Sequence, residues 1–166
     1  MDNMIRNLAV SGLMVLGMAG SALALAGTGP GFCHAPTFAA LPATEVSNMF
    51  DLNKAGLTTH LHGEKMMFTT AGYQGYLAAL RRSGTLAAVH DGVKITAQPD
   101  GPRQMTGPCD APTVRVPSRF TYVVGKKVYH RQHTVVLHFV ADPAIPMLKI
   151  AQMVVIPPLK SPRGTE

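Results

Sequence analysis

The chain contains seven histidines, whose neutral imidazoles are common ligands of zinc and copper in proteins. His60 and His62 stand two residues apart and would share one face of a strand. Farther along, His130 and His138 would share a strand face, whereas His133 would point the other way. No cysteine or acid stands beside them at the spacing of a ligand set. We therefore expect no metal and no cofactor; His60 and His62 are the candidates should a metal site exist, and solvated surface histidines are the alternative.

The sequence has no motif typical of a catalytic nucleophile or a nucleotide site. It contains no Gly-x-Ser-x-Gly, no P-loop and no Gly-x-Gly-x-x-Gly pattern. The acids after residue 26 fall at expected helix starts or in loops, not on the apolar face of a strand where burial would raise a pKa. They are Glu45, Asp51, Glu64, Asp91, Asp100, Asp110, Asp142 and Glu166. We predict that the protein has no catalytic residues and is not an enzyme.

The charge balance is basic, with 15 Lys and Arg against 9 Asp and Glu. The cations are scattered in runs no longer than two, and the chain has no Trp. Nucleic-acid binding usually needs a basic stripe interleaved with aromatic residues. We therefore expect no direct nucleic-acid contact, and a basic surface that meets acidic lipid or a partner protein.

Residues 1–26 have the pattern of an export signal. Arg6 gives a positive start, residues 8–25 are apolar apart from two serines, and Ala24-Leu25-Ala26 offers a small-x-small cleavage site. The alternative is a retained membrane anchor, because the apolar run is just long enough to span a bilayer. Its several glycines favour a cleaved signal.

Cys33 and Cys109 are the two cysteines of the chain. Export would place them in an oxidising compartment, where two cysteines of one domain usually pair. We predict a disulfide between them that ties the N-terminal segment to the loop before the long strands. Closing a loop of this size stabilises a fold by roughly 4 kcal/mol in the chain-entropy model.

Residues 68–86 predict an amphipathic helix whose start, face and end are all visible. Thr69 or Thr70 can cap its first turn, since a threonine hydroxyl accepts a hydrogen bond from a free N–H group. Gly84 can close it in the left-handed conformation. Four large side chains recur at helical spacing on one face: Tyr73, Tyr76, Leu77 and Leu80.

The remaining segments predict helices followed by strands. After a flexible lead-in over residues 27–43, a short helix begins near Thr44, and residues 57–67 are ambiguous between a turn and a helix. Alternating apolar residues predict strands at 93–97, 114–124, 128–140 and 148–156, with a proline-rich loop over 99–112. We therefore predict an α+β domain over residues 44–157, with N-terminal helices packed on a curved, mainly antiparallel sheet of about four strands, and a mobile C-terminal tail over 158–166.

The helix also carries a recognisable order of residues. It reads Phe-Thr-x-x-Gly-aromatic, then an aromatic three residues on, then Ala-Leu-x-x-Ser-Gly, formed by Phe68, Thr69, Gly72, Tyr73, Tyr76, Ala79, Leu80, Ser83 and Gly84. The last strand adds Ile150 and Gln152. This pattern resembles the DotI, IcmL and TraM family of type IV secretion proteins over residues 44–157. Because the chain starts with a signal-like stretch, it resembles a short exported branch of that family.

The resemblance implies both fold and function. It implies the roll of nuclear-transport-factor-like and VirB-type scaffold proteins, and a non-enzymatic role in a Dot/Icm-type secretion or conjugation system. The expected partners are other secretion-system subunits, a second copy of the chain and the membrane surface. The expected location is the periplasm of a Gram-negative bacterium, either soluble or held to the inner membrane by an uncleaved N-terminus.

Two other functions stay open. The same roll can enclose a small apolar ligand or an enzyme site, which needs an acid or histidine inside it; filling of the roll by Tyr73, Leu77, Phe120 and Tyr122 would argue against this. The third possibility is periplasmic metal binding through His60 and His62.

Overall fold

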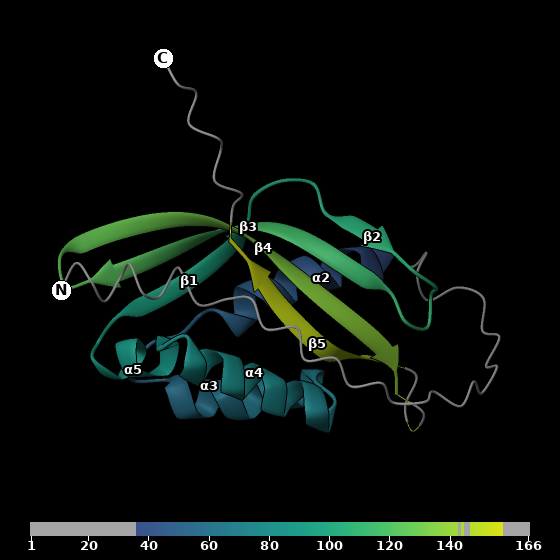
Figure 1. Cartoon of the computed structure of the whole chain (residues 1–166), viewed down its shortest axis with the longest axis horizontal. Coiled ribbons are helices and arrows are strands. Elements are labelled where there is room, and N and C mark those ends of the chain that lie inside the picture. Colours follow the sequence, from purple (N-terminus) through teal and green to yellow (C-terminus); the bar gives the residue numbers. More distant parts are fainter. Residues whose placement is uncertain (1–35, 143, 145–146, 158–166) are drawn as a thin grey trace, which may run out of the picture.

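The computed structural model describes residues 36–142, 144 and 147–157 (Figure 1). The predictions for the export signal, for Cys33 and for the C-terminal tail fall outside these residues. Among the described residues, no helix combines the length and the apolar character needed to cross a membrane.

The helices come first in the chain. They are α2 (Pro36–Met49), α3 (Leu57–Glu64), the short 3-10 helix η2 (Lys65–Met67), α4 (Thr70–Arg82) and α5 (Thr85–His90). Residues 57–67 are thus helical, and α4 confirms the predicted amphipathic helix. Thr69 is its cap, because its Oγ1 accepts a hydrogen bond of 3.0 Å from the backbone N–H of Gly72.

Two helical segments differ from the prediction. Helix α2 begins at Pro36, not near Thr44, and Pro42 lies inside it. The burial of Val46 and Met49 anchors this helix, so tertiary packing outweighs the local preference of proline for a loop. Gly84 has the expected left-handed backbone (φ 73°), but the chain continues from it directly into α5.

The strands form one antiparallel sheet. They are β1 (Lys94–Pro99), β2 (Gln104–Thr106), β3 (Thr113–Val124), β4 (Lys127–Ala141) and β5 (Leu148–Ile156), in the order β1-β3-β4-β5. Strand β2, within the segment predicted as a loop, pairs with the beginning of β3, and β1 pairs with the rest of β3. The helices followed by this open sheet confirm the predicted α+β class.

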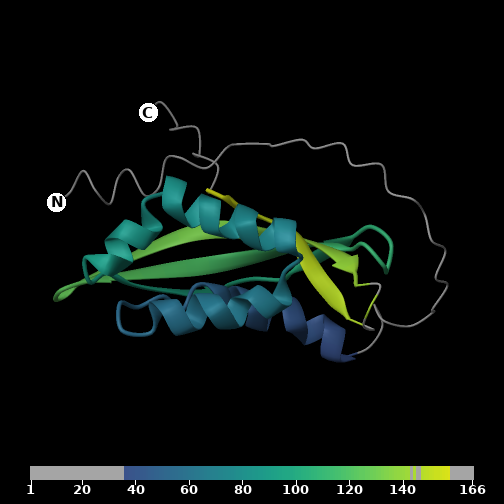
Figure 2. The same ribbon diagram turned by 90° about the horizontal axis from the view of Figure 1, so that it is seen from below.

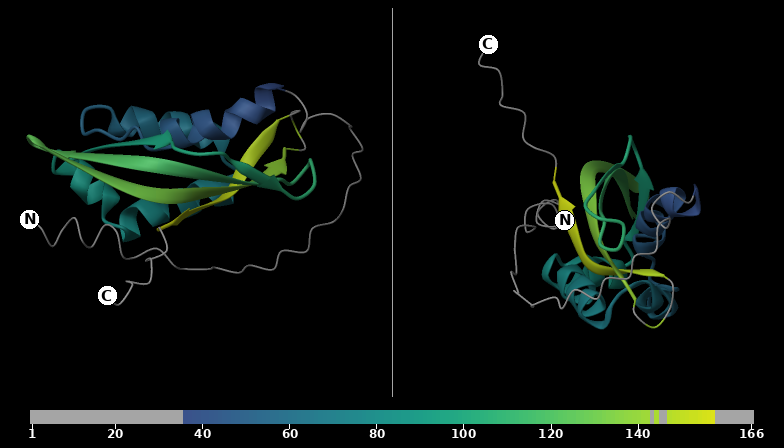
Figure 3. Two further views of the ribbon diagram at one scale, coloured as in Figure 1. Left: turned by 90° about the horizontal axis from the view of Figure 1, so that it is seen from above. Right: turned by 90° about the vertical axis from the view of Figure 1, so that its right-hand side faces the viewer.

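One face of the sheet is covered by helices and the other is not. Viewed from the helical side, α4 with α5 and α2 with α3 form two rows, with β3 and β4 visible between them (Figure 2). The right-hand view of Figure 3 shows β5 curving over the helical side. Of the described helices, α2 packs on β1 and β3, and α4 packs on β5. We call these two sides the covered face and the open face.

Strand register decides which residues reach the covered face. Val114 pairs with Leu137 and Val116 pairs with Val135, and all four are buried. Phe50 after α2 meets Phe120 of β3 edge to face, with ring centroids 4.7 Å apart. The largest fully buried side chains of this core are Tyr76, Phe139, Met49, Leu52, Ile95, Leu137 and Ile150.

Candidate functional site

The first residues of the pattern that resembles DotI, IcmL and TraM lie where α4 crosses β5. The Thr69 N–H donates a 3.0 Å hydrogen bond to the Ile150 carbonyl, and Phe68 pairs with Ile150 as an isolated parallel bridge. Gly72 is buried against the same strand: a Cβ there would collide with the Ile150 carbonyl oxygen and come within 3.0 Å of the Ala151 oxygen. The glycine therefore sets how closely the helix approaches the strand.

The two tyrosines of α4 tie it to the other helices. The Tyr73 hydroxyl donates to the Leu61 carbonyl at 2.7 Å, and the Tyr76 hydroxyl donates to the Met49 carbonyl at 2.7 Å. Phe68 stacks on Tyr76 with ring centroids 5.1 Å apart. Burial, followed by the nearby Glu64 and Tyr73, raises the pKa of Tyr76, so this hydroxyl stays protonated as a donor.

The later residues of the pattern close the helix. Leu80 is buried, Ala79 is half-buried and its carbonyl accepts the Ser83 N–H, and the Ser83 hydroxyl donates to the Leu80 carbonyl at 3.2 Å. Gln152 differs from the others, because it is exposed on β5 opposite His138. Apart from Gln152, the pattern describes how the core is built.

Two acids lie inside the molecule, on helices and not on the strand faces where the sequence analysis looked for acids with a raised pKa. Glu45 of α2 is 5% exposed and Glu64 at the end of α3 is 8% exposed. Burial raises the pKa of both carboxyl groups, and the nearby Glu45 raises that of Glu64 further, to about 7. One oxygen of each side chain, Oε2, is buried without a hydrogen-bond partner. Such a pair can hold a proton at neutral pH.

The spacing of neighbouring apolar residues could have located both acids. Glu45 follows Pro42 by three residues and precedes Met49 by four, so it falls on the buried stripe of α2. Glu64 follows Leu61 by three residues, and Leu61 packs against the core. A position near a helix end therefore does not by itself make an acid exposed, and helical phase is the better guide.

A shallow hollow of about 370 Å³ lies beside the middle of α2. Its lining residues are Ala43, Pro99, Gly101, Pro102, Arg103 and Val116. Neither carboxyl of the buried pair reaches it, and it contains no histidine. This hollow therefore offers no acid–base chemistry.

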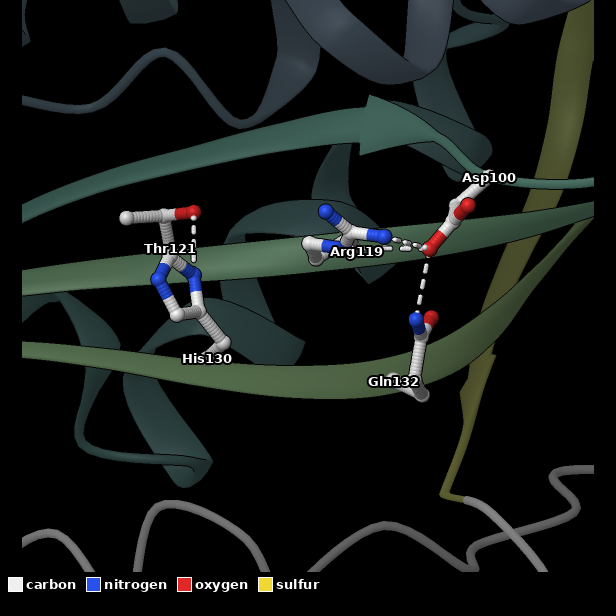
Figure 4. A network of polar contacts seen from close by, with 5 residues as sticks. All are labelled: Asp100, Arg119, Thr121, His130 and Gln132. Carbon is white, nitrogen blue, oxygen red and sulfur yellow. Dashed lines mark hydrogen bonds and ion pairs between the residues drawn. The ribbon is translucent and has the colours of Figure 1, made fainter.

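The open face carries a hydrogen-bonded polar network (Figure 4). Asp100 Oδ2 accepts bonds from Arg119 Nη2 at 2.8 Å, Arg119 Nε at 3.1 Å and Gln132 Nε2 at 2.6 Å. The hydrogen bonds from Gln132 and Arg119 lower the pKa of Asp100. Beside it, Thr121 Oγ1 and His130 Nδ1 are 3.1 Å apart. These side chains present fixed hydrogen-bonding groups to the solvent.

The histidines do not converge on a site. His60 and His62 lie on helix α3 and not on a strand, so residues two apart point to different sides. His138 is 2.9 Å from Thr113 Oγ1, on the open face. His133 lies on the covered face against Phe120, at 5.0 Å between ring centres, and burial, then Arg131, lowers its pKa. Within the described ranges, no three potential metal ligands lie together.

Cys109 lies in the turn between β2 and β3. Its predicted partner, Cys33, is outside the described residues, so the disulfide stays a prediction.

Comparison with known proteins finds similarity in structure alone. No protein-family model and no curated protein matches the sequence. The periplasmic domain of DotI is similar with a TM-score of 0.65 and 19% identity, over 75% of this chain and 96% of that domain. The chain has the fold of the DotI periplasmic domain.

Two further structures extend this likeness. An IcmL-like type IV secretion system protein from Legionella pneumophila is similar to this chain with a TM-score of 0.68 and 14% identity, over 76% of this chain and 96% of that one. A nuclear transport factor 2-like protein from Salmonella enterica matches with a TM-score of 0.52 and 12% identity, over 77% and 99% of the two chains. The predicted α+β roll of the nuclear-transport-factor-like type is therefore confirmed as a fold.

Proposed function

We propose that this protein is a non-enzymatic periplasmic component of a Dot/Icm-type type IV secretion or conjugation system, acting through contacts with other subunits and with a second copy of itself. The observation that carries the proposal is the DotI-like fold, which covers 75% of this chain and nearly all of the DotI domain. The resemblance in the α4 and β5 residues supports it independently. Fold alone does not assign a function, so the surface must supply the contacts.

The open face is the surface that we assign to these contacts. Helix α4 is held on β5 from the covered side, through Thr69, Gly72 and Ile150. The open face therefore stays available, and Asp100 holds the Arg119 guanidinium in one orientation there. A preoriented guanidinium with further N–H groups free to donate suits recognition of a carboxylate or carbonyl on a partner.

Capture from cells that contain the candidate secretion system tests this proposal. The full chain carries a C-terminal tag, contacts are fixed by crosslinking, and captured proteins are identified by mass spectrometry. Arg119→Glu should reduce recovery of secretion subunits, because it reverses a charge on the open face. Lys65→Glu makes the same charge change at an exposed residue of η2 and should leave recovery unchanged.

Two results would overturn the proposal. If the parent chain captures no secretion component, the proposed role is wrong. If both variants lose recovery of secretion subunits equally, the open face is not the contact surface. Light scattering tests self-association. A protein that stays monomeric at cellular concentration would contradict the proposed contact with a second copy.

The enzymatic or ligand-binding alternative has one observation in its favour, the buried Glu45–Glu64 pair. Against it, Phe120 is buried, and Tyr73, Leu77 and Tyr122 pack on the core at the positions that would fill the roll. The alternative requires a small apolar probe such as anilinonaphthalene sulfonate to bind the native protein, and Glu64→Gln to change its affinity. Stoichiometric zinc or copper in equilibrium dialysis, lost in His60→Ala or His62→Ala, would support the metal-binding alternative.

A further inference from the structure

Three chain connections meet at one end of the molecule. They are the loop between α2 and α3, the passage from α5 into β1, and the turn between β3 and β4, which lie at the same end in Figures 1 and 2 and in the left-hand view of Figure 3. Backbone pairing agrees: Leu52 of the first loop bridges to Ile95 of β1, and Lys94 pairs with Val123, next to the β3–β4 turn. Helix α4 ends near this point as well, directly before α5.

This end carries a concentration of positive charge, which we call the basic end. It consists of six exposed residues, Lys54, Arg81, Arg82, Lys94, Lys126 and Lys127. No ion pair with an acid joins any of them among the described residues. The acids nearby are Asp51 and Asp91, and Asp91 already lies 3.8 Å from His90.

The rest of the described chain is nearly balanced. It has six other lysines and arginines against five acids. Two of these cations are already paired, Arg119 with Asp100 and Lys149 with Asp142, each at 2.8 Å. The net charge of the described residues is therefore concentrated at one end.

The shape and chemistry of the basic end fit a broad anionic surface. Its cations come from separate loops and helix ends, and the hollow beside α2 includes none of them. Val128, directly after Lys126 and Lys127, is 55% exposed at the beginning of β4. Long cationic side chains around an exposed apolar one suit a lipid headgroup layer, where each cation near an anionic surface contributes about 1 kcal/mol.

We infer that the basic end docks the protein onto anionic phospholipid, with Lys126 and Lys127 among the headgroups and Val128 at their boundary with the acyl chains. The inference rests on the periplasmic location in the proposed function, because that location places the protein beside a phospholipid leaflet. Screening limits the attraction to roughly 8 Å at physiological salt, so the basic end contacts the membrane while more distant cations contribute little. The open face then remains free for other subunits.

Cosedimentation with vesicles tests the docking. Protein is purified from cells that express all 166 residues and mixed with phosphatidylcholine vesicles, either pure or containing phosphatidylglycerol. The difference in binding between the two vesicle types is the measured quantity, because an apolar contribution from any part of the chain is common to both. We expect binding that depends on phosphatidylglycerol and weakens as salt is added.

Matched variants locate the contact. Lys126→Glu with Lys127→Glu should weaken the phosphatidylglycerol-dependent binding about tenfold or more, because four units of charge change at the surface. Lys65→Glu with Arg103→Glu changes the net charge equally, at exposed residues outside the basic end, and should keep most of the binding. Val128→Ser should reduce the total binding to phosphatidylglycerol-containing vesicles, but by less than the double reversal does. Circular dichroism of each variant establishes that it is folded.

The inference is overturned if phosphatidylglycerol produces no additional binding, or if both double variants lose binding equally. It is also overturned if the parent protein does not bind vesicles and the double variant Lys126→Glu with Lys127→Glu no longer captures a partner protein. The basic end would then bind an acidic protein. Lost vesicle binding with intact subunit capture leaves the proposed secretion role standing. If vesicle binding is intact but no secretion subunit is captured, the docking inference stands and the proposed secretion role fails.

Discussion

The pKa of a carboxyl group is shifted in opposite directions on the covered and the open face. Behind the covered face, burial and the neighbouring Glu45 raise the pKa of Glu64 to about 7. On the open face, hydrogen bonds from Gln132 and Arg119 lower the pKa of Asp100. Desolvation dominates where helices exclude water, and hydrogen bonding dominates where water remains. The covered face therefore sets stability, and the open face can change its charges at little cost to the fold.

Gly72, where α4 lies closely against β5, should be the position of the covered face at which a substitution lowers stability most. Gly72→Ala would place a Cβ against the Ile150 carbonyl, so α4 must move away from β5. We expect this variant to lose about 3 kcal/mol of unfolding free energy, near the upper end of the usual cost of overpacking. Urea denaturation measures the loss.

Gly75→Ala is its control in the same helix. No atom lies within 4 Å of a Cβ at Gly75, which is exposed, so the better helix propensity of alanine should stabilise the protein by about 0.5 to 1 kcal/mol. If both variants changed stability in the same direction and by the same amount, helix propensity alone would explain them, and the close approach would have no energetic role.

The buried acids should produce the next largest effect, as a dependence of stability on pH. Folded Glu64 holds its proton up to about pH 7, whereas in the unfolded chain its carboxyl releases the proton near its ordinary pKa of 4.5. Between these values the folded state binds more protons, so the unfolding free energy falls as pH rises. This contribution is complete below about pH 4.5, is lost by about pH 7, and amounts to about 3 kcal/mol.

Glu64→Gln isolates this contribution. His133, whose pKa burial lowers, acts with the opposite sign, so the measured quantity is the difference between parent and variant denaturation curves at each pH. The difference should favour the variant increasingly from pH 5 to about pH 7 and then level off. Asp51→Asn removes a carboxyl at an exposed position and is the control. A constant difference for Glu64→Gln would mean that this carboxyl is ionised equally in both states.

The sequence predicted the parts of the fold that repeat a pattern over many residues. Alternation located β3 and β4 to within about a residue of their ends, and the spacing of Tyr76 and Leu80 identified the buried side of α4. Strand β2 and helix α5 were missed because three and six residues are too few to show a period. The first turns of α2 were missed because Pro42 favours a loop locally.

The candidate site was harder to predict for a different reason. Charge and hydrogen-bonding environments depend on which segments meet, and spacing along one segment does not reveal this. Asp100, Arg119 and Gln132 come from three places in the sequence and converge only through the pairing of β3 with its neighbours. His60 and His62 were placed on a strand face because residues 57–67 gave no clear period, and the helix separates them.

Thr69→Ala should have a smaller effect on the covered face. The variant removes the hydroxyl that accepts the Gly72 N–H, and a lost cap of this kind costs about 1 kcal/mol. Thr70→Ala is the matched control, because Thr70 is exposed and the cap belongs to Thr69. Equal losses in thermal or urea denaturation would mean that the two hydroxyls share the capping role.

The open face should give the smallest stability change and the sharpest test of the contrast between faces. Asp100→Asn removes a charge from an exposed network, where solvent screens the ion pair with Arg119, so the unfolding midpoint should match that of the parent within error. The same variant should alter subunit capture, because the guanidinium loses its orienting carboxylate. Gln132→Ala, which leaves the Arg119–Asp100 pair in place, should disturb capture less. If Asp100→Asn unfolded the protein as readily as Gly72→Ala, the open face would be part of the framework that holds the fold, and the division of roles between the two faces would be wrong.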